Sequence, residues 1–348
     1  MRLGEARAAA AHWVAAHARP APDYLGAYFS GSTVGRPDDT ELPVSSDVDV
    51  VVVTEGAEAP AKPGKLVHRG ALLEITYEPW SLLADPEAVL GAYHLAGGFR
   101  RDTVIDDPTG RLRALHAYVA PRFARREHVR RRCLDARHRV ESRLAALDTT
   151  QPLAARVLGW LFPTGVTAHV PLVAALRNPT IRLRYPAARD VLTAYGQETL
   201  YPELLALLGC AEVSAPLVRH HLAELERTFD ATVPVVRTPF FFGSDLTERA
   251  RPVAVDGSRE LIDRGDHREA VFWVLATFAR CHTVLAVDAP ALHTARLPAF
   301  REAVADLAGI AHTGDLLARR DEVLRFVPRL WTVAEEIMTA GPEVVGQG

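Results

Sequence analysis

The stretch SGSTVGRPDDTELPVSSDVDVVVV, residues 30–53, contains the pattern from which the fold can be predicted. It opens with Gly31 and Ser32 and closes with Asp47 and Asp49, which stand one residue apart before a run of valines. A β-branched run of this kind indicates a buried strand. Because residues two apart on a strand point to the same side, the two carboxylates are expected to lie together where this strand begins.

Two adjacent carboxylates repel each other unless a cation lies between them. Hard oxygen ligands with few protein donors suit Mg²⁺ that also binds substrate phosphates. Glu74, in ALLEITYEPW, is the best placed third carboxylate. It would complete a site for two metal ions or act as the base that activates an attacking hydroxyl. Glu78, in the same segment, is its rival, and a solvent-facing residue in an alternating strand is the simpler alternative.

The Gly-Ser pair suits the other half of such a site. A glycine lets the backbone approach an anion closely, and the Ser32 hydroxyl with nearby backbone N–H groups can hold a triphosphate tail. The two halves together indicate metal-assisted transfer of a nucleotidyl group. The alternative is that Gly31 and Ser32 are turn residues and that the aspartates are exposed acids at a strand entry.

These motifs resemble a known family. SGSTVG followed by SDVDVVVV is similar to the signature of the polymerase β-type nucleotidyltransferase superfamily, and LLEITYEP resembles the strand with the third carboxylate in aminoglycoside (streptomycin-type) adenylyltransferases. The resemblance covers roughly residues 24–80 in motif terms. It implies that Asp47 and Asp49 hold Mg²⁺, that Ser32 contacts nucleotide phosphates and that Glu74 is the catalytic base. The spacer TVGRPDDTELPVSS is somewhat long for the family, and TVGR stands where small-Arg-Gly often follows the pair.

The chain outward from this motif predicts an α+β protein. A first helix is followed by strand patterns in YLGAYFSGS, DVDVVVV and RDTVIDDPTG, and KLVHRGALLEITYEPW reads as two strands joined at Arg69-Gly70. These segments predict a small mixed β-sheet with flanking helices, a nucleotidyltransferase domain over residues 1–109. Helical periodicity then dominates, so residues 110–348 are expected to form an all-helical bundle domain that binds the acceptor.

Three features of the expected helices can be checked. WSLLADPEAVLGAYHLA is expected to break at Asp85-Pro86, because proline restricts the residue before it. HREAVFWVLATFARCHTVLAV is apolar nearly all round and is expected to be a buried central helix, capped by Asp266 and Glu269. The last long helix is expected to be interrupted or kinked at Pro328.

Composition excludes several classes of protein. Among 348 residues, 48% are hydrophobic and 24% are charged, and the net charge is −3, so duplex nucleic acid is not favoured as a partner. Lysine occurs only at Lys62 and Lys65. Cys133, Cys210 and Cys281 are far apart and lack zinc spacing, which predicts buried free thiols. No window is expected to span a bilayer, and a cytoplasmic protein is expected.

The predicted reaction is Mg²⁺-dependent transfer of a nucleoside monophosphate, AMP from ATP or another nucleotide, to a hydroxyl of a small molecule. An aminoglycoside-like acceptor, and with it antibiotic resistance, is one possibility, because a polycationic sugar needs carboxylates. Several of the candidate carboxylates are explained equally well as helix caps or loop residues, and nearby arginines offset their charge. They are Asp245, Glu248, Asp256, Asp263 and Asp266. The alternatives are a protein-modifying nucleotidyltransferase of an antitoxin-like system and a non-catalytic nucleotide sensor. Acceptor identity, base preference and oligomeric state stay open.

Overall fold

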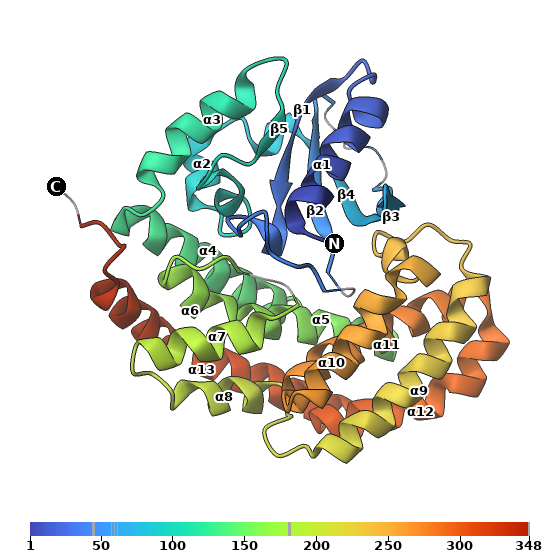
Figure 1. The fold of residues 1–348 in the computed structure, drawn as a ribbon. Helices are drawn as coiled ribbons and strands as arrows, with labels where there is room; N and C mark the ends of the chain where they lie inside the picture. Colours follow the sequence, from blue (N-terminus) through green and yellow to red (C-terminus); the bar gives the residue numbers. More distant parts are fainter. Residues whose placement is uncertain (44–45, 57, 59, 61, 180–181, 347–348) are drawn as a thin grey trace. The chain divides into compact units, whose positions relative to one another are not determined.

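A computed structural model of the chain describes residues 1–43, 46–56, 58, 60, 62–179 and 182–346 (Figure 1). Val44 and Ser45, in the spacer of the opening motif, lie outside these described residues. The contacts divide the chain into two compact units. Unit 1 comprises Met1–Asp135, Val173–Ile181 and Gly341–Gly348, and unit 2 comprises Ala136–Leu172 and Arg182–Ala340.

The described part of unit 1 contains a five-stranded sheet with the order β3-β4-β2-β1-β5. The strands are β1 (Tyr24–Ser30), β2 (Val48–Thr54), β3 (Gly64–His68), β4 (Ala71–Pro79) and β5 (Val104–Asp106). β2 and β4 are parallel, and the other neighbouring pairs are antiparallel, so the sheet is mixed. The prediction of an α+β protein with a mixed sheet is confirmed.

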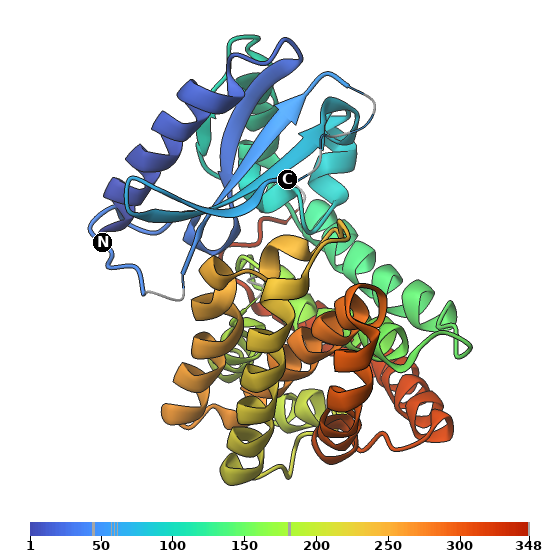
Figure 2. The ribbon, with the colours of Figure 1, turned by 90° about the vertical axis from the view of Figure 1, so that its right-hand side faces the viewer.

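Alternation along β2 separates the two faces of this sheet. Val48, Val50 and Val52 are fully or almost fully buried, and they pack in one hydrophobic cluster with the alanine-rich helix α1 (Leu3–Trp13). Helix α1 lies beside the sheet in both views (Figures 1 and 2). The intervening residues of β2, among them Asp49, therefore belong to the opposite face of the sheet.

A tight turn joins β3 to β4 at the position that the sequence predicts. Arg69 and Gly70 have φ angles of 48° and 82°, and His68 pairs with Ala71 across the turn. Two central residues with positive φ match the right-handed twist of the strands, which is why such turns fix the register of a hairpin. This turn consequently determines which β3 residue faces each residue of β4.

Short helices follow the strands of unit 1. Among them are α2 (Pro86–Gly91) and α3 (Arg111–Val119), with helical turns at Trp80–Leu82, Ala96–Phe99 and Ala120–Arg122. The expected break at Asp85-Pro86 is confirmed, because Asp85 caps the start of α2 by accepting a 2.9 Å hydrogen bond from the Glu87 N–H. The long helix α4 (Arg126–Ala145) crosses from unit 1 into unit 2.

The regular elements in the described part of unit 2 are all helical. Its helices are α5 (Leu153–Val166), α6 (His169–Ala174), whose last two residues belong to unit 1, α7 (Arg184–Ala194), α8 (Leu200–Leu207), α9 (Ala215–Thr232), α10 (Gly257–Asp263), α11 (His267–Asp288), α12 (Pro290–Ala308) and α13 (Thr313–Ala340). The predicted central helix is confirmed, since α11 packs against α5, α9, α10 and α12 and is buried over most of its surface. The three cysteines are free and buried, as expected.

Two details of these helices differ from expectation. Helix α13 continues through Pro328, so the predicted interruption is absent, and a kink at this residue stays a prediction. Asp266 does stand at the start of α11, but its side chain makes no capping hydrogen bond. It instead binds the guanidinium groups of Arg189 and Arg264, at 2.8 and 2.6 Å. A charged partner competes effectively with a backbone N–H for the same carboxylate.

The sequence predicts no segment with the length and hydropathy of a membrane span, and in this respect the prediction is wrong. Leu153–Ala174 and His267–Asp288 both satisfy the length and hydropathy of such a span. In each of them 78% of the apolar window is buried inside the protein, which is typical of the core helix of a folded domain.

Candidate functional site

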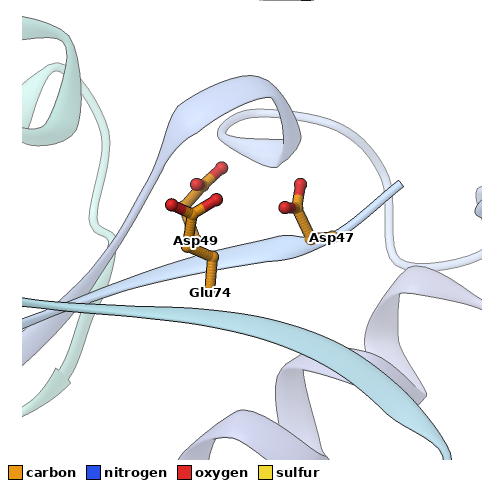
Figure 3. A group of neighbouring side chains, drawn as sticks. All are labelled: Asp47, Asp49 and Glu74. Carbon is orange, nitrogen blue, oxygen red and sulfur yellow. The ribbon is translucent and has the colours of Figure 1, made fainter. Parts of the chain in front are cut away.

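The three predicted carboxylates lie together on one face of the sheet (Figure 3). Asp49 pairs with Glu74 across the parallel strands β2 and β4, so the two side chains are direct cross-strand neighbours. Asp47 immediately precedes β2 and shares the side of Asp49. One oxygen from each carboxylate lies within 4.8 Å of the others, and Figure 3 shows all three pointing to the same side of the strands.

Glu78, the rival third carboxylate, is not part of this cluster. It pairs in register with Val53, further along β2, and accepts a hydrogen bond of 3.1 Å from the Tyr28 hydroxyl. Burial raises the pKa of Glu78, and the Tyr28 hydrogen bond opposes this shift. The geometry therefore selects Glu74 as the residue that joins the two aspartates.

Both lysines of the chain lie at the acidic cluster. Lys65 on β3 pairs with Glu74 across the hairpin, and its ammonium group binds Glu74 and lies 2.6 Å from Oδ2 of Asp47. The Lys62 ammonium binds Glu74 as well. The Lys65 side chain is only 5% exposed, so its charge is held within the site.

Burial and mutual charge give the three acids different proton affinities. Burial raises the pKa of Asp49 well above its usual value, and the nearby charges of Asp47 and Glu74 raise it further. Burial also raises the pKa of Asp47, against the opposing effect of Lys65. Burial would do the same at Glu74, but the ammonium groups of Lys65 and Lys62 outweigh it and lower its pKa to about 2.

A divalent cation suits this set of groups. Asp49 is held beside two further carboxylates at a distance where like charges repel, and a cation coordinated between them would stabilise the ionised form. Carboxylate oxygens are the ligands that Mg²⁺ prefers in proteins. Asp47 and Asp49 supply oxygens suited to that ion, whereas Glu74 is already neutralised by two ammonium groups.

The Gly31-Ser32 turn lies directly against the acidic cluster. Gly31 begins a short helical turn, Gly31–Thr33, after β1 and has a φ of 70°, in the left-handed region that favours glycine. A Cβ atom at this position would lie 1.8 Å from Oδ2 of Asp49. The Ser32 side chain is exposed. The structure thus brings Gly31 into contact with Asp49 and leaves the serine hydroxyl accessible.

The acids considered for a polycationic acceptor lie in unit 2, and four of the five are engaged by arginine. Asp245 binds Arg280, Asp263 binds Arg219, and Asp266 is held as described above. Asp256 binds Arg251 and Arg259. These pairs favour the structural explanation of the carboxylates over recognition of a cation.

Sequence reasoning missed the role of the lysines, although the signal was present. A two-residue turn at Arg69-Gly70 places His68 opposite Ala71, and counting back along both strands places Lys65 opposite Glu74. The predicted turn therefore already implied a cation beside the third carboxylate. Lys62 precedes β3 and has no such register to reveal it.

Comparisons with known proteins give little further information. No protein-family model and no curated protein sequence matches the chain. Among solved structures the chain is similar to a nucleotidyltransferase-like protein from Exiguobacterium sibiricum 255-15, with 13% sequence identity over 84% of this chain and 91% of that chain. The TM-score is 0.29, which is too low to establish a common fold, so the function is inferred from the site itself.

Proposed function

We propose that the protein is a Mg²⁺-dependent nucleotidyltransferase, which transfers a nucleoside monophosphate from a nucleoside triphosphate to a hydroxyl group and releases pyrophosphate. The observation that carries this proposal is the cluster of Asp47, Asp49 and Glu74, whose oxygens lie within 4.8 Å of one another beside the Gly31-Ser32 turn. Paired carboxylates next to an anion-binding turn combine the two requirements of metal-assisted phosphoryl chemistry.

The proposed roles follow from the positions of the side chains. Asp47 and Asp49 would hold one or two Mg²⁺ ions, which neutralise charge on the phosphates and on the leaving pyrophosphate. The exposed Ser32 hydroxyl would donate to the β- and γ-phosphates, next to Gly31, whose lack of a side chain makes room for the Asp49 carboxylate. The proposed co-substrate is ATP, and transfer of AMP makes the enzyme an adenylyltransferase.

The role of Glu74 depends on its lysine partners. A carboxylate with a pKa of about 2 accepts a proton poorly at neutral pH, so Glu74 in its described state is ill suited to deprotonate an acceptor hydroxyl. Displacement of Lys62 and Lys65 would restore its basicity. Glu74→Gln separates the two roles: loss of turnover with unchanged Mn²⁺ affinity supports the catalytic base, and loss of both supports a metal ligand.

The acceptor is proposed to be a small molecule, bound with the help of the helical residues 110–348. An aminoglycoside-like antibiotic fits the resemblance of LLEITYEP, but the arginine partners of the unit 2 acids weigh against a polycation there. We further propose that the protein is cytoplasmic, that it has no membrane or nucleic-acid partner, and that its activity confers antibiotic resistance if the acceptor is an antibiotic. Transfer of AMP to a protein side chain is the alternative if no small molecule serves as acceptor.

One observation favours a second candidate function, a nucleotide sensor without turnover. Lys65 occupies the space between Asp47 and Glu74, where a catalytic cation would be expected to act. A site that keeps its lysine when nucleotide binds would recognise the triphosphate without activating a hydroxyl. Binding of Mg²⁺-ATP without pyrophosphate release, for any acceptor, would favour this function over catalysis.

The deciding experiment measures Mg²⁺-dependent pyrophosphate release from each of the four nucleoside triphosphates with aminoglycosides, lincosamides and nucleosides as acceptors. We expect acceptor-dependent release that is reduced at least about 100-fold in Asp49→Asn and in Asp47→Asn, since metal ligands and phosphate clamps contribute several kcal/mol to such reactions. Glu78→Gln is the matched control, an acid on the same strand as Glu74 that lies outside the cluster. Full activity in Asp49→Asn would refute the proposal.

A further inference from the structure

A cavity lined by arginine lies within unit 1. Its volume is about 150 Å³, and its polar lining consists of Arg100, Arg101, Arg132, Arg177 and Asn178, with no carboxylate among the lining residues. The apolar part of the lining includes Tyr93, Phe123 and Leu176. All of these residues belong to unit 1. This group of residues is called the arginine pocket below.

Arg132 is the most informative residue of the pocket because it is buried. Only 2% of its surface is exposed, and its guanidinium donates to the backbone carbonyls of Leu90 and Phe123 at 3.1 and 2.7 Å. It also stacks on the Phe123 ring, 4.0 Å from the ring centre. Among the described residues no carboxylate pairs with it. Burying a charge in this way is costly unless an opposite charge is supplied.

The other three arginines increase the positive charge. Arg100 binds the Leu176 carbonyl and forms one ion pair, 2.8 Å long, with the exposed Glu343. Arg101 and Arg177 are exposed and have no ion pair among the residues that the structure describes. In the part of the chain that the structure describes, the four guanidinium groups of the pocket therefore pair with a single carboxylate, which leaves a strong excess of positive charge.

The pocket adjoins the turn that contacts the acidic cluster. Val34 and Gly35, which directly follow the Gly31–Thr33 turn, line it, and the Arg101 side chain lies against Gly35. The Asn178 side-chain amide donates a hydrogen bond to the Gly31 carbonyl. A ligand that extends from the acidic cluster over this turn would reach the arginines.

We infer that the arginine pocket binds a phosphate group of a substrate, so that the site accepts anionic rather than polycationic small molecules. Arginine forks match the geometry of phosphate oxygens, and the buried Arg132 gains the counter-charge that no carboxylate of the described residues provides. The inference builds on the proposed nucleotidyl transfer. The phosphate has two sources, the triphosphate tail of the nucleotide or a phosphate-bearing acceptor. In either case a polycationic aminoglycoside in this pocket would be repelled.

The first test measures binding alone. Inorganic phosphate and pyrophosphate are titrated calorimetrically into the full-length protein with EDTA present. We expect both to bind, pyrophosphate more tightly, and we expect the Arg101→Gln/Arg177→Gln variant to bind at least about tenfold more weakly, because each lost charge-assisted contact to phosphate contributes strongly. Both substitutions lie at exposed positions, so the fold is retained. Arg36→Gln, an exposed arginine outside the pocket lining, is the matched control.

Asp49→Asn separates this inference from the proposed function. If the unmodified protein releases no pyrophosphate with any acceptor, and both it and Asp49→Asn still bind phosphate, the pocket is supported and the nucleotidyltransferase is refuted. The inference itself is overturned if the unmodified protein binds neither anion, or if Arg36→Gln weakens binding as much as the double variant does.

Steady-state kinetics then identifies the source of the phosphate. If the triphosphate tail occupies the pocket, the double variant raises the KM for ATP and leaves the KM for the acceptor unchanged. If the acceptor carries the phosphate, the reverse holds, and phosphorylated acceptors outperform their unphosphorylated counterparts. Unchanged KM values for both substrates would contradict the inference.

Discussion

Lys65 is the residue whose environment most directly controls the proposed metal site. Its ammonium lies between Asp47 and Glu74, and the antiparallel register of β3 and β4 holds it there. At a separation of about 4 Å and an effective dielectric constant of about 20, two unit charges interact by about 4 kcal/mol. A fixed ammonium at this place therefore competes with a divalent cation for the same carboxylates.

We predict that Lys65→Met binds Mn²⁺ or Mg²⁺ at least about tenfold more tightly than the unmodified protein, because the competing charge is gone. Calorimetry or Mn²⁺ paramagnetic resonance measures the affinity. Without metal, the same variant should unfold at a lower temperature than the unmodified protein, because the ammonium group that neutralised the carboxylates is absent. Added Mg²⁺ should raise the unfolding temperature again.

Lys62→Met is the control for this variant. Among the residues that the structure describes, Lys62 forms its ion pair with Glu74, and its side chain is 31% exposed, so solvent screens its charge more than that of Lys65. We expect a smaller gain in metal affinity. Unchanged metal affinity in Lys65→Met would show that the lysine does not compete for the cation site, and weaker binding would show that it supports the site.

His282, in the core of unit 2, makes stability depend on pH. Burial and the neighbouring His293 lower its pKa to about 3, and its ring stacks on Phe300. In the unfolded chain a histidine titrates near pH 6.5. Between these two values the unfolded state binds up to one more proton than the folded state, so the free energy of unfolding falls as the pH drops below 6.5, and this loss levels off near pH 3.

We predict that His282→Phe reduces the loss of stability on acidification from pH 7 to pH 5. The difference in slope should approach about 1.4 kcal/mol per pH unit below pH 6, the value for one proton. Urea unfolding at several pH values measures it. His312→Phe is the control, since that ring is exposed on the protein surface. Parallel pH profiles for the unmodified protein and His282→Phe would disprove the assignment.

At the scale of elements, the turn after β1 is the segment on which the site depends most. Gly31 combines a positive φ with direct contact to Asp49. We predict that Gly31→Ala lowers the free energy of unfolding by more than about 1 kcal/mol and abolishes Mn²⁺ binding, because the new methyl group must displace the Asp49 carboxylate. Chemical denaturation and Mn²⁺ titration measure the two effects.

Gly110→Ala separates the two causes. Gly110 has a similar φ of 74°, at the start of α3, but a Cβ atom there would meet nothing within 4 Å. It should therefore cost about 1 kcal/mol for the backbone conformation and leave metal binding unchanged. Equal effects of the two alanine variants on Mn²⁺ binding would show that the contact between Gly31 and Asp49 is unimportant.

The elements themselves were predictable to different degrees. All five strands follow from short apolar runs bounded by glycine, proline and charged residues, and the Arg69-Gly70 turn follows from its position between two such runs. The predicted helix cap at Asp266 is absent because its carboxylate binds Arg264, which is near in sequence, and Arg189, which is remote in sequence. Local patterns reveal the start of α11 but not which group its carboxylate will bind.

At the scale of the whole molecule, the candidate site belongs entirely to unit 1. Asp47, Asp49 and Glu74 lie in it, as do the Gly31–Thr33 turn and the arginine pocket. We predict that Mg²⁺ alone slows hydrogen exchange in β2 and β4 and leaves α9 and α12 of unit 2 unchanged, since a ligand protects the region that it stabilises. Exchange followed by mass spectrometry measures this. Equal protection of both units would contradict it.

The sequence by itself determined the mixed sheet, the helical remainder and the two aspartates, because each depends on patterns within one or two adjacent elements. Alternation places Asp47 and Asp49 on one side of β2, and helical periodicity identifies α11 as a core helix. The choice of Glu74 over Glu78 needed the pairing of β2 with β4, which sets the register between distant segments.

Only the tertiary structure decided which charges lie around the site. The pairing of Lys65 with Asp47 depends on the order β3-β4-β2 of the sheet. The arginine pocket joins residues 93–132 to residues 173–179, a segment that follows α4 and α5 in the chain. Electrostatic interactions act between groups that are close in space whatever their separation in sequence, so the charge balance of a site emerges only when the chain is folded.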